Sequence, residues 1–209
     1  MLQDRKRVII IGWKKELNLN YPKFESCISN CNVSKHLFSD LPTLQNGQGT
    51  LGVSKYKNEG NEYLFKSGIR NDADFTTQHI TRPNNINDLE IYRIAVEEWN
   101  KGTRLNYSKL PKRLIKHSNT QIFSNRFQVV NGKGISHTVV AHIAMDGHYY
   151  IHPDIKQNRS ISVREAARIQ SFPDDYFFEG SRTAAFKQIG NAVPVLMADG
   201  IAKKIKKLL

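Results

Sequence analysis

The first apolar segment of the chain is a short run of β-branched residues, Val8–Ile11, which follows several charged residues and ends at Gly12. An uninterrupted run of this kind predicts a strand that is buried on both faces, as in a parallel sheet. From Asn18 to about Arg82 the sequence is polar and interrupted by glycines, which indicates loops with short strands. The strand therefore needs neighbouring strands that the following region does not obviously supply.

A helix is predicted in the middle of the chain. Asn87 and Asp88 precede a segment that continues to Lys101 and Gly102. Apolar residues recur in it at three- and four-residue spacing: Leu89, Tyr92, Val96 and Trp99. This spacing predicts an amphipathic helix of about four turns.

A hairpin is predicted next. Residues 137–143 alternate in a strand-like pattern, Asp146 and Gly147 suit a tight turn, and residues 148–151 suit a returning strand. Four histidines lie on or beside this hairpin: His137, His142, His148 and His152. Their spacing matches no familiar set of metal ligands, so hydrogen bonding or DNA contact is favoured and no metal site is predicted.

Two helices are predicted near the end. Ser162 and Glu165 form a capping-box pattern, which predicts a short helix to about Ser171 that ends before Pro173. Pro194 suits the first position of a last helix. Its apolar stripe is Leu196, Ile201, Ile205 and Leu208, and its basic residues are Lys203, Lys204, Lys206 and Lys207. The chain is expected to finish as a basic amphipathic helix.

Charge narrows the class of partner. The 209 residues contain 31 Lys and Arg against 19 Asp and Glu, a formal net charge of +12. This balance favours nucleic acid as the partner. No apolar run approaches the roughly 18 residues that span a bilayer, so no membrane partner is predicted, and the N-terminus does not resemble a signal peptide. The candidate DNA-contact residues are Arg104, Lys112, Arg113, Lys116 and Arg126, with His117, Tyr107, Phe123 and Phe127 among them. A solvated loop is the alternative for any one of them.

The only two cysteines, Cys27 and Cys31, offer no disulfide framework, which suggests a reducing compartment. Their spacing could form half of a zinc site, but no second pair of cysteines exists. Ordinary thiols are therefore favoured.

Three segments resemble motifs of the DNA cytosine-5 methyltransferase family. Residues 3–12 (QDRKRVIIIG) are similar to its eighth motif, residues 159–174 (RSISVREAARIQSFPD) to its ninth, and residues 188–194 (QIGNAVP) to its tenth. The family keeps its target-recognition region between the eighth and ninth motifs, where Thr138 and Val139 also match a threonine followed by an aliphatic residue. Where Val195 stands, the family usually has a second proline.

The resemblance implies roles for individual residues. Arg7 would contact O2 of the flipped cytosine, and Arg5 would support the fold or contact phosphate, although both could be ordinary solvated arginines. Asn191, Gly190 and Ala192 would close over S-adenosyl-L-methionine, although Asn191 could merely cap or bend the chain. Thr138 would contact DNA. Ser162 and Glu165 are interpreted as a helix cap, and Arg164 and Arg168 as scaffold or phosphate contacts.

The implied fold class is mixed α/β. A strand at 1–13 and the turn and helix at 187–209 would belong to a Rossmann-like methyltransferase domain that binds S-adenosyl-L-methionine. Residues 14–157 would form a small target-recognition domain with short strands and helices, and 158–186 the ninth-motif helix and loop.

Parts of the family pattern are missing from this sequence. The family's Gly-rich cofactor motif, Pro-Cys nucleophile and Glu-Asn-Val motif are not found, and neither Cys27 nor Cys31 follows a proline. The chain is therefore expected to be inactive alone and to work as one part of a split enzyme. Its partners would be double-stranded DNA and an N-terminal catalytic half, in the cytoplasm of a bacterial or phage-type restriction-modification setting. A non-catalytic DNA-binding remnant is the alternative, and an RNA-binding protein would need motifs that the sequence lacks.

Overall fold

The computed structural model describes residues 1–24, 30–116 and 126–208. The predictions that concern Cys27, His117 and Phe123 lie outside these residues. The helices are α1 (Glu62–Lys66), α2 (Ile86–Asn100), α3 (Val163–Ile169), α4 (Arg182–Asn191) and α5 (Val195–Lys206), and the strands are β1 (Val53–Lys55) and β2 (Phe75–Thr77). Short 3-10 turns lie at Lys15–Leu17, Tyr107–Lys109, Lys112–Leu114 and Ala141–Ala144, and a π-helical turn at Ser34–Phe38.

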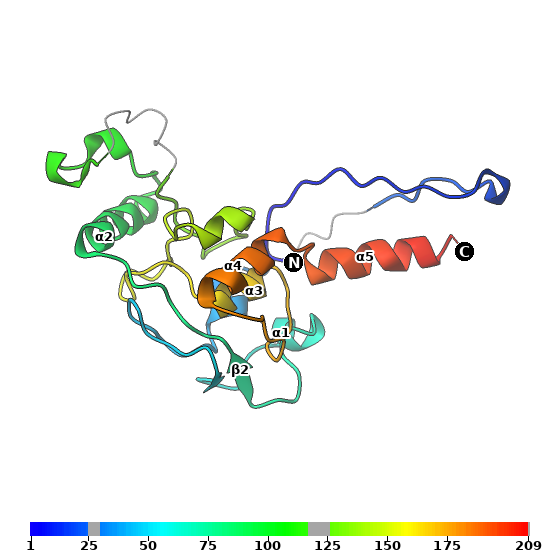
Figure 1. The fold of residues 1–209 in the computed structure, drawn as a ribbon, viewed down its shortest axis with the longest axis horizontal. Helices are drawn as coiled ribbons and strands as arrows, with labels where there is room; N and C mark the ends of the chain where they lie inside the picture. The colour runs from blue at the N-terminus through cyan, green and yellow to red at the C-terminus, as the bar shows by residue number, and fades with distance from the viewer. Residues whose placement is uncertain (25–29, 117–125, 209) are drawn as a thin grey trace.

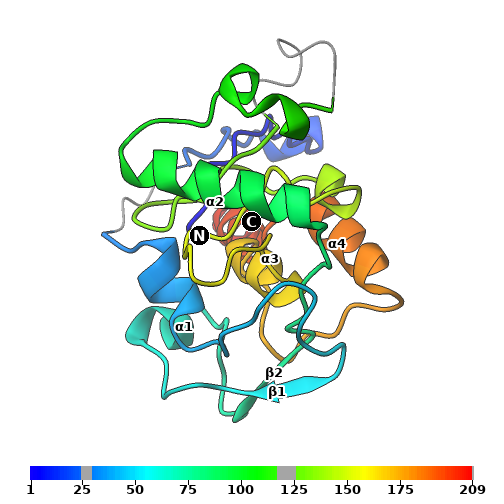
Figure 2. The same ribbon diagram turned by 90° about the vertical axis from the view of Figure 1, so that its left-hand side faces the viewer.

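The described part of the chain is mixed and mostly helical. Strands β1 and β2 pair antiparallel, with Val53 opposite Thr77. The packed part of the molecule, called the body, has these strands at one end and α2 at the other, with α3 between them (Figure 2). Strand β2, with the loop that follows it, contacts α3 through Thr77, whose carbonyl accepts from Arg164 Nε at 2.7 Å. No helix among the described residues is long and apolar enough to cross a membrane.

Helix α2 begins where a polar side chain accepts a hydrogen bond from one of its first backbone amides. The Asn85 side chain accepts from the Asp88 amide at 3.0 Å, and the helix ends before Gly102, which has a positive φ of 83°. The predicted helix is confirmed, with Asn85 as its cap. Tyr92 and Val96 are buried on the face that contacts the body.

Helix α3 is enclosed on every side. Its capping box is present: Ser162 Oγ accepts from the Glu165 amide at 3.0 Å, and Glu165 Oε2 accepts from the Ser162 amide at 2.7 Å. All seven of its residues are buried, including Arg164 and Arg168 at 0% exposure. Such charges can be buried only when they are paired and hydrogen-bonded.

The buried charges around α3 form two ion-pair groups. Arg168 contacts Asp40 and also Asp174, with 2.5 Å between its Nη2 and Asp174 Oδ2, and Asp174 raises the Arg168 pKa against the opposing effect of burial. Arg159 forms a bidentate pair with Glu165 at 2.7 Å for each bond. Burial alone would raise the Glu165 pKa, but Arg159 outweighs it and holds that pKa below its usual range. Arg164 instead donates to the carbonyls of Thr77, Pro173 and Tyr176. Because Arg164 and Arg168 are both fully buried, neither can reach a phosphate.

The predicted strand at Val8–Ile11 is wrong for this structure. Val8 and Ile10 are 90% and 91% exposed, and no strand forms there. The segment belongs to an arm that leaves the body, turns at Lys15–Leu17 and returns, with Tyr21 Oη donating to the Ile9 carbonyl at 2.6 Å. Because the described residues contain no parallel sheet, the apolar run has nothing to pair with.

The predicted hairpin after residue 136 is also wrong. Ala141–Ala144 forms a 3-10 turn, and only isolated bridges occur nearby, such as Val129 with Ile151. Among the described residues, no three His, Cys, Asp or Glu side chains lie close enough together to hold a metal ion. Instead, His137 Nε2 contacts the Tyr149 carbonyl at 2.6 Å, and His148 Nδ1 contacts Tyr92 Oη at 2.9 Å.

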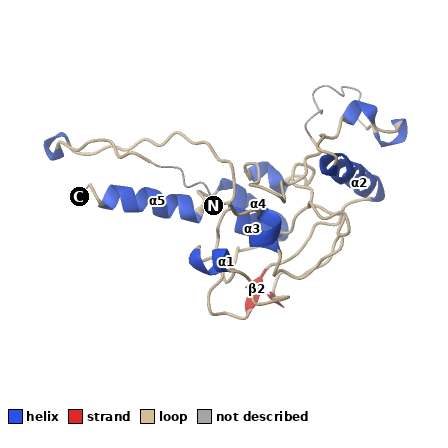
Figure 3. Cartoon of the chain, turned by 180° about the vertical axis from the view of Figure 1, so that it is seen from behind, coloured by secondary structure: helices blue, strands red, loops and turns tan. Residues whose placement is uncertain are grey.

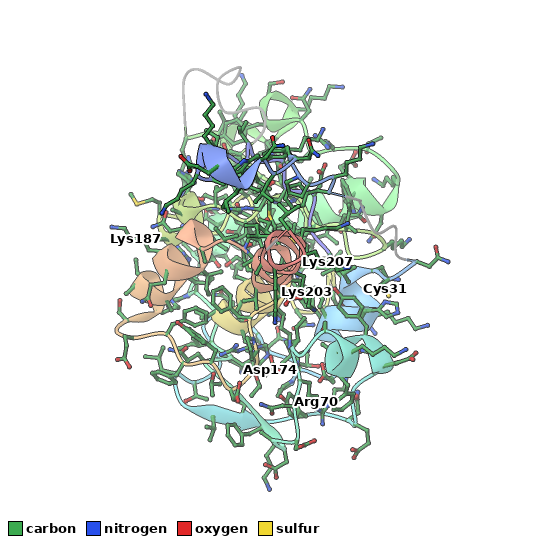
Figure 4. The ribbon with its side chains drawn as sticks, turned by 90° about the vertical axis from the view of Figure 1, so that its right-hand side faces the viewer. Cys31, Arg70, Asp174, Lys187, Lys203 and Lys207 are labelled. Carbon is green, nitrogen blue, oxygen red and sulfur yellow. The ribbon has the colours of Figure 1, made fainter. Side chains whose placement is uncertain are left out.

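The chain ends in two consecutive helices, of which α4 was not predicted. Helix α5 begins at Val195, one residue after the predicted start, so Pro194 is its cap. No residue of α5 is buried, and both α5 and the N-terminal arm leave the body on the same side (Figures 1 and 3). Figure 4 looks along α5 from its free end and labels Lys203 and Lys207 on it.

The largest core cluster draws residues from all four of the segments defined in the sequence: Leu2, Leu37, Val139, Ile161, Val163 and Ile189 are among them. The body therefore packs as one unit around α3.

Candidate functional site

Four segments that are far apart in the sequence meet at one buried amide pair. Gln3 Nε2 donates to Gln170 Oε1 at 3.0 Å, and Gln3 Oε1 accepts from the Val139 amide at 2.9 Å. Gln170 Nε2 donates to the Ile189 carbonyl at 2.8 Å. Gln3 is 5% exposed and Gln170 is fully buried. This arrangement, called the junction below, joins the segments that resemble the eighth, ninth and tenth motifs to the Thr138-Val139 segment.

Backbone pairing holds the N-terminal segment in the junction. The Asp4 amide donates to the Ser136 carbonyl at 2.8 Å, and the Ser136 amide donates to the Leu2 carbonyl at 2.9 Å. Thr138 Oγ1 donates to the Asp4 carbonyl at 2.5 Å. The Thr138 hydroxyl therefore donates its hydrogen bond within the protein, so toward another molecule it can act only as an acceptor.

Arg5 and Arg7 lie in different surroundings. Arg5 Nη1 donates to the Val139 carbonyl at 2.8 Å and its Nη2 to the Ala192 carbonyl at 3.2 Å. Burial lowers the Arg5 pKa, and the charge of Arg7 lowers it further. Arg7 is exposed, and its Nη1 donates to the adjacent Lys6 carbonyl at 2.7 Å. Arg5 thus has a structural position, while the guanidinium of Arg7 is accessible.

Gly190 lies where α4 packs against the 3-10 turn at Ala141–Ala144. A Cβ atom at this position would lie 2.4 Å from both the Ala141 nitrogen and the Val140 carbonyl carbon. Only glycine permits this approach, so its role is to let α4 contact the Thr138 segment. No sequence pattern pointed to this contact, although a glycine inside a helix is itself a signal of close packing.

Asn191 is the last residue of α4 and is exposed, so it does not cap α5. The Ala192 amide donates to the Gln188 carbonyl at 3.1 Å, and the Ala192 carbonyl accepts from Arg5. The α5 start is tied to the junction instead, since the Val195 amide donates to the Gln170 carbonyl at 3.1 Å.

The residues between α4 and α5 offer S-adenosyl-L-methionine only some of the contacts that a binding pocket needs. Asn191 presents an amide that can donate and accept, and Val193 beside it is 57% exposed. The backbone groups of Ala192 are already used, so only its methyl group is available. These residues suit at most one wall of a cofactor pocket.

All five basic residues that are candidates for DNA contact lie in the described part of the chain, but only some of them form ion pairs with carboxylates. Arg113 forms a bidentate pair with Glu90 of α2, with bonds of 2.7 and 2.5 Å. Lys116 lies 3.8 Å from Asp88.

Arg126 lies 3.4 Å from Asp146. Among the described residues, Arg104 and Lys112 form no ion pair, which leaves their charges more available to phosphate. The sequence does not reveal the pairing, because each acidic partner lies at least 20 residues away in the chain.

Comparison with known proteins relates this chain to DNA methylases. A family model described as C-5 cytosine-specific DNA methylase matches residues 1–207. The type II methyltransferase M.Bpa9945I of Bacillus paralicheniformis is 47% identical over 214 residues, covering 99% of this chain and 48% of that protein. M.DdeI of Desulfomicrobium norvegicum is 28% identical, covering 97% of this chain and 50% of that protein.

A solved structure, described as a putative DNA modification methyltransferase encoded within a prophage of E. coli, is similar with a TM-score of 0.54. It is 19% identical, and the match covers 93% of this chain and 53% of that one, so it supports the fold. The chain spans about half the length of the relatives that it matches.

Proposed function

Because this chain belongs to the C-5 cytosine-specific DNA methylase family, we propose that it is the DNA-recognising, C-terminal part of a DNA (cytosine-5)-methyltransferase. It would complete the pockets for S-adenosyl-L-methionine and the flipped cytosine, and it would be inactive without the N-terminal half. The observation that carries this proposal is the junction, where the residues resembling three family motifs are hydrogen-bonded to one another.

The apolar surfaces outside the body support the need for a complementary half. Val8 and Ile10 of the arm are 90% and 91% exposed, and α5 buries none of its residues. Apolar surface of this kind is usually covered by a partner. The arm and α5 leave the body on one side, so a single sheet-containing partner would cover both (Figure 1).

In this proposal the segments 1–13 and 187–209 join the catalytic domain, 14–157 recognises DNA and 158–186 supports both. Arg7 would donate to O2 of the extruded cytosine, where its charge stabilises negative charge that develops on the ring. Asn191 would hydrogen-bond the cofactor, which supplies the methyl group. Lys112 would contact a phosphate and Arg104 would bind DNA, since their charges have no carboxylate partner in the described part of the chain.

Complementation tests the proposal. Transfer of labelled methyl from S-adenosyl-L-methionine to plasmid DNA would be measured with this chain, with the portion of M.Bpa9945I that this chain does not match, and with both mixed. We expect activity only in the mixture. Arg7→Ala should reduce it while Lys6→Ala, an equal loss of charge one residue away, should have little effect. Asn191→Ala should weaken activity at low cofactor concentration, and Thr183→Ala, exposed on the same helix, should not.

An inert mixture would contradict the enzymatic proposal. If the chain nevertheless bound duplex DNA, the non-catalytic DNA-binding function would be favoured instead.

A further inference from the structure

A pocket of about 230 Å³ lies beside the junction, between α2 and the segment 135–137. Trp99 of α2 and Phe127 supply aromatic walls, and Ala95 and Val129 supply smaller apolar ones. Asp4 and Arg104 also line it, and both are exposed. The volume is below the roughly 300–1,000 Å³ of pockets that enclose drug-sized molecules, so it suits a smaller ligand.

The lining has the chemistry that recognises a flat heteroaromatic ring. Aromatic side chains offer faces for stacking, and a carboxylate with a guanidinium offers an acceptor and donors for the edge of the ring. Asn131 adds an amide with both functions. Neither Asp4 nor Arg104 is in an ion pair within the described residues, so both can bind a ligand.

The charge of the molecule indicates where such a ring would come from. The chain carries a net charge of +12, and Arg104, which lines the pocket, has no carboxylate partner among the described residues. A nucleobase attached to a polyanion would be drawn to this face, whereas an uncharged aromatic metabolite would not.

We propose that this pocket binds one extrahelical base of the DNA, distinct from the target cytosine. Arg7, the residue proposed for the target cytosine, does not line the pocket. The inference rests on the proposed DNA-binding function. Each unpaired base can donate to Asp4: adenine, cytosine and guanine through an exocyclic amine, and thymine through its N3–H.

The test uses Trp99 as a reporter in the full chain. The chain has two tryptophans, Trp13 and Trp99, so Trp13→Phe leaves Trp99 as the only one. Three duplexes of one sequence would be titrated: fully paired, with one unpaired adenine, and with an abasic site at the same position. We expect the adenine bulge to bind about tenfold more tightly than the abasic bulge and to quench Trp99.

Ile135→Phe provides an independent variant, because Ile135 lines the pocket but is 45% exposed, so a larger side chain can occlude the pocket without entering the core. It should abolish the preference for the adenine bulge and leave affinity for the paired duplex unchanged. Lys35→Ala, an exposed position that does not line the pocket, is the control.

Equal affinity for adenine and abasic bulges, with no change in Trp99 emission, would overturn the inference while leaving DNA binding intact. Failure to bind any duplex would instead contradict the proposed function. In that case adenosine alone would be titrated to millimolar concentration, and an unchanged Trp99 signal would overturn the pocket as well.

Discussion

The contact at Gly190 gives a prediction in which two identical substitutions should have different effects. Gly190 in α4 and Gly200 in α5 are both helical, and replacing either with alanine gains about 1 kcal/mol of helix propensity. At Gly200 the added Cβ meets nothing within 4 Å. At Gly190 it would lie 2.4 Å from backbone atoms of Val140 and Ala141, about 1 Å short of an ordinary contact.

Backbone cannot yield as a flexible side chain can, so α4 and the turn at Ala141–Ala144 would have to separate. Overpacking of this kind costs about 1–3 kcal/mol, and a shift of rigid backbone should fall at or above the upper end. After the propensity gain, Gly190→Ala should lower the free energy of unfolding by about 2 kcal/mol. Gly200→Ala should leave it unchanged or raise it by up to about 1 kcal/mol.

Urea unfolding followed by circular dichroism measures both variants. If Gly190→Ala is as stable as the parent chain, the close approach of α4 to the Thr138 segment does not exist in solution. The DNA affinity of the same variant provides a second readout, because the contact aligns the Thr138 segment with the tenth-motif region.

Four further predictions concern the buried charges, the α3 cap and the basic surface. Burial lowers the pKa of His152 to about 4 from an ordinary value near 6.5, so the folded state favours the neutral ring. The free energy of unfolding should therefore fall by up to about 3 kcal/mol as pH decreases from 6.5 toward 4. An unfolding free energy that stays constant over this range, or a His152→Gln variant with the same slope, would contradict the assignment. Ser162→Ala should cost about 1 kcal/mol or more through loss of the cap, measured as a lower urea midpoint, and an unchanged midpoint would show that the cap is dispensable. Arg168→Met should cost about 3–5 kcal/mol because it removes the cation shared by two buried carboxylates, of which Asp40 keeps only its pair with Arg70. Adding Asp174→Asn should restore part of the loss in thermal unfolding. Lys112→Ala should weaken DNA binding at all sequences alike and reduce the salt dependence by about one released ion, whereas a sequence-selective effect would indicate base contact.

Local signals in the sequence predicted those elements whose residues interact with their near neighbours. The spacing in α2 and the capping box of α3 depend on contacts within four residues, and both helices are present. The arm failed as a strand because its β-branched run needs partners that the described residues do not contain. The hairpin failed because the histidines and tyrosines that suggested alternation bond to distant groups, such as His148 to Tyr92.

Long-range electrostatics was also hidden from the sequence. Asp40 lies 128 residues from Arg168, and nothing local marks it as the partner of a buried arginine. The family resemblance, by contrast, identified Gln3 and Gln170 as parts of separate motifs, and the structure brings them within 3.0 Å. Motif resemblance therefore located the residues of the junction, while their mutual contacts required the fold.

The junction is held by neutral amides, whereas α3 is held by ion pairs, and only the ion pairs contain groups that titrate. Neither glutamine titrates, and the Gln3–Gln170 bond gains nothing from low ionic strength. A change of salt that loosens phosphate contacts should leave the alignment of the N-terminal and C-terminal segments intact. Release of DNA and disassembly of the junction are thus separable events, and a protein washed from DNA at high salt should keep the geometry it needs to bind again.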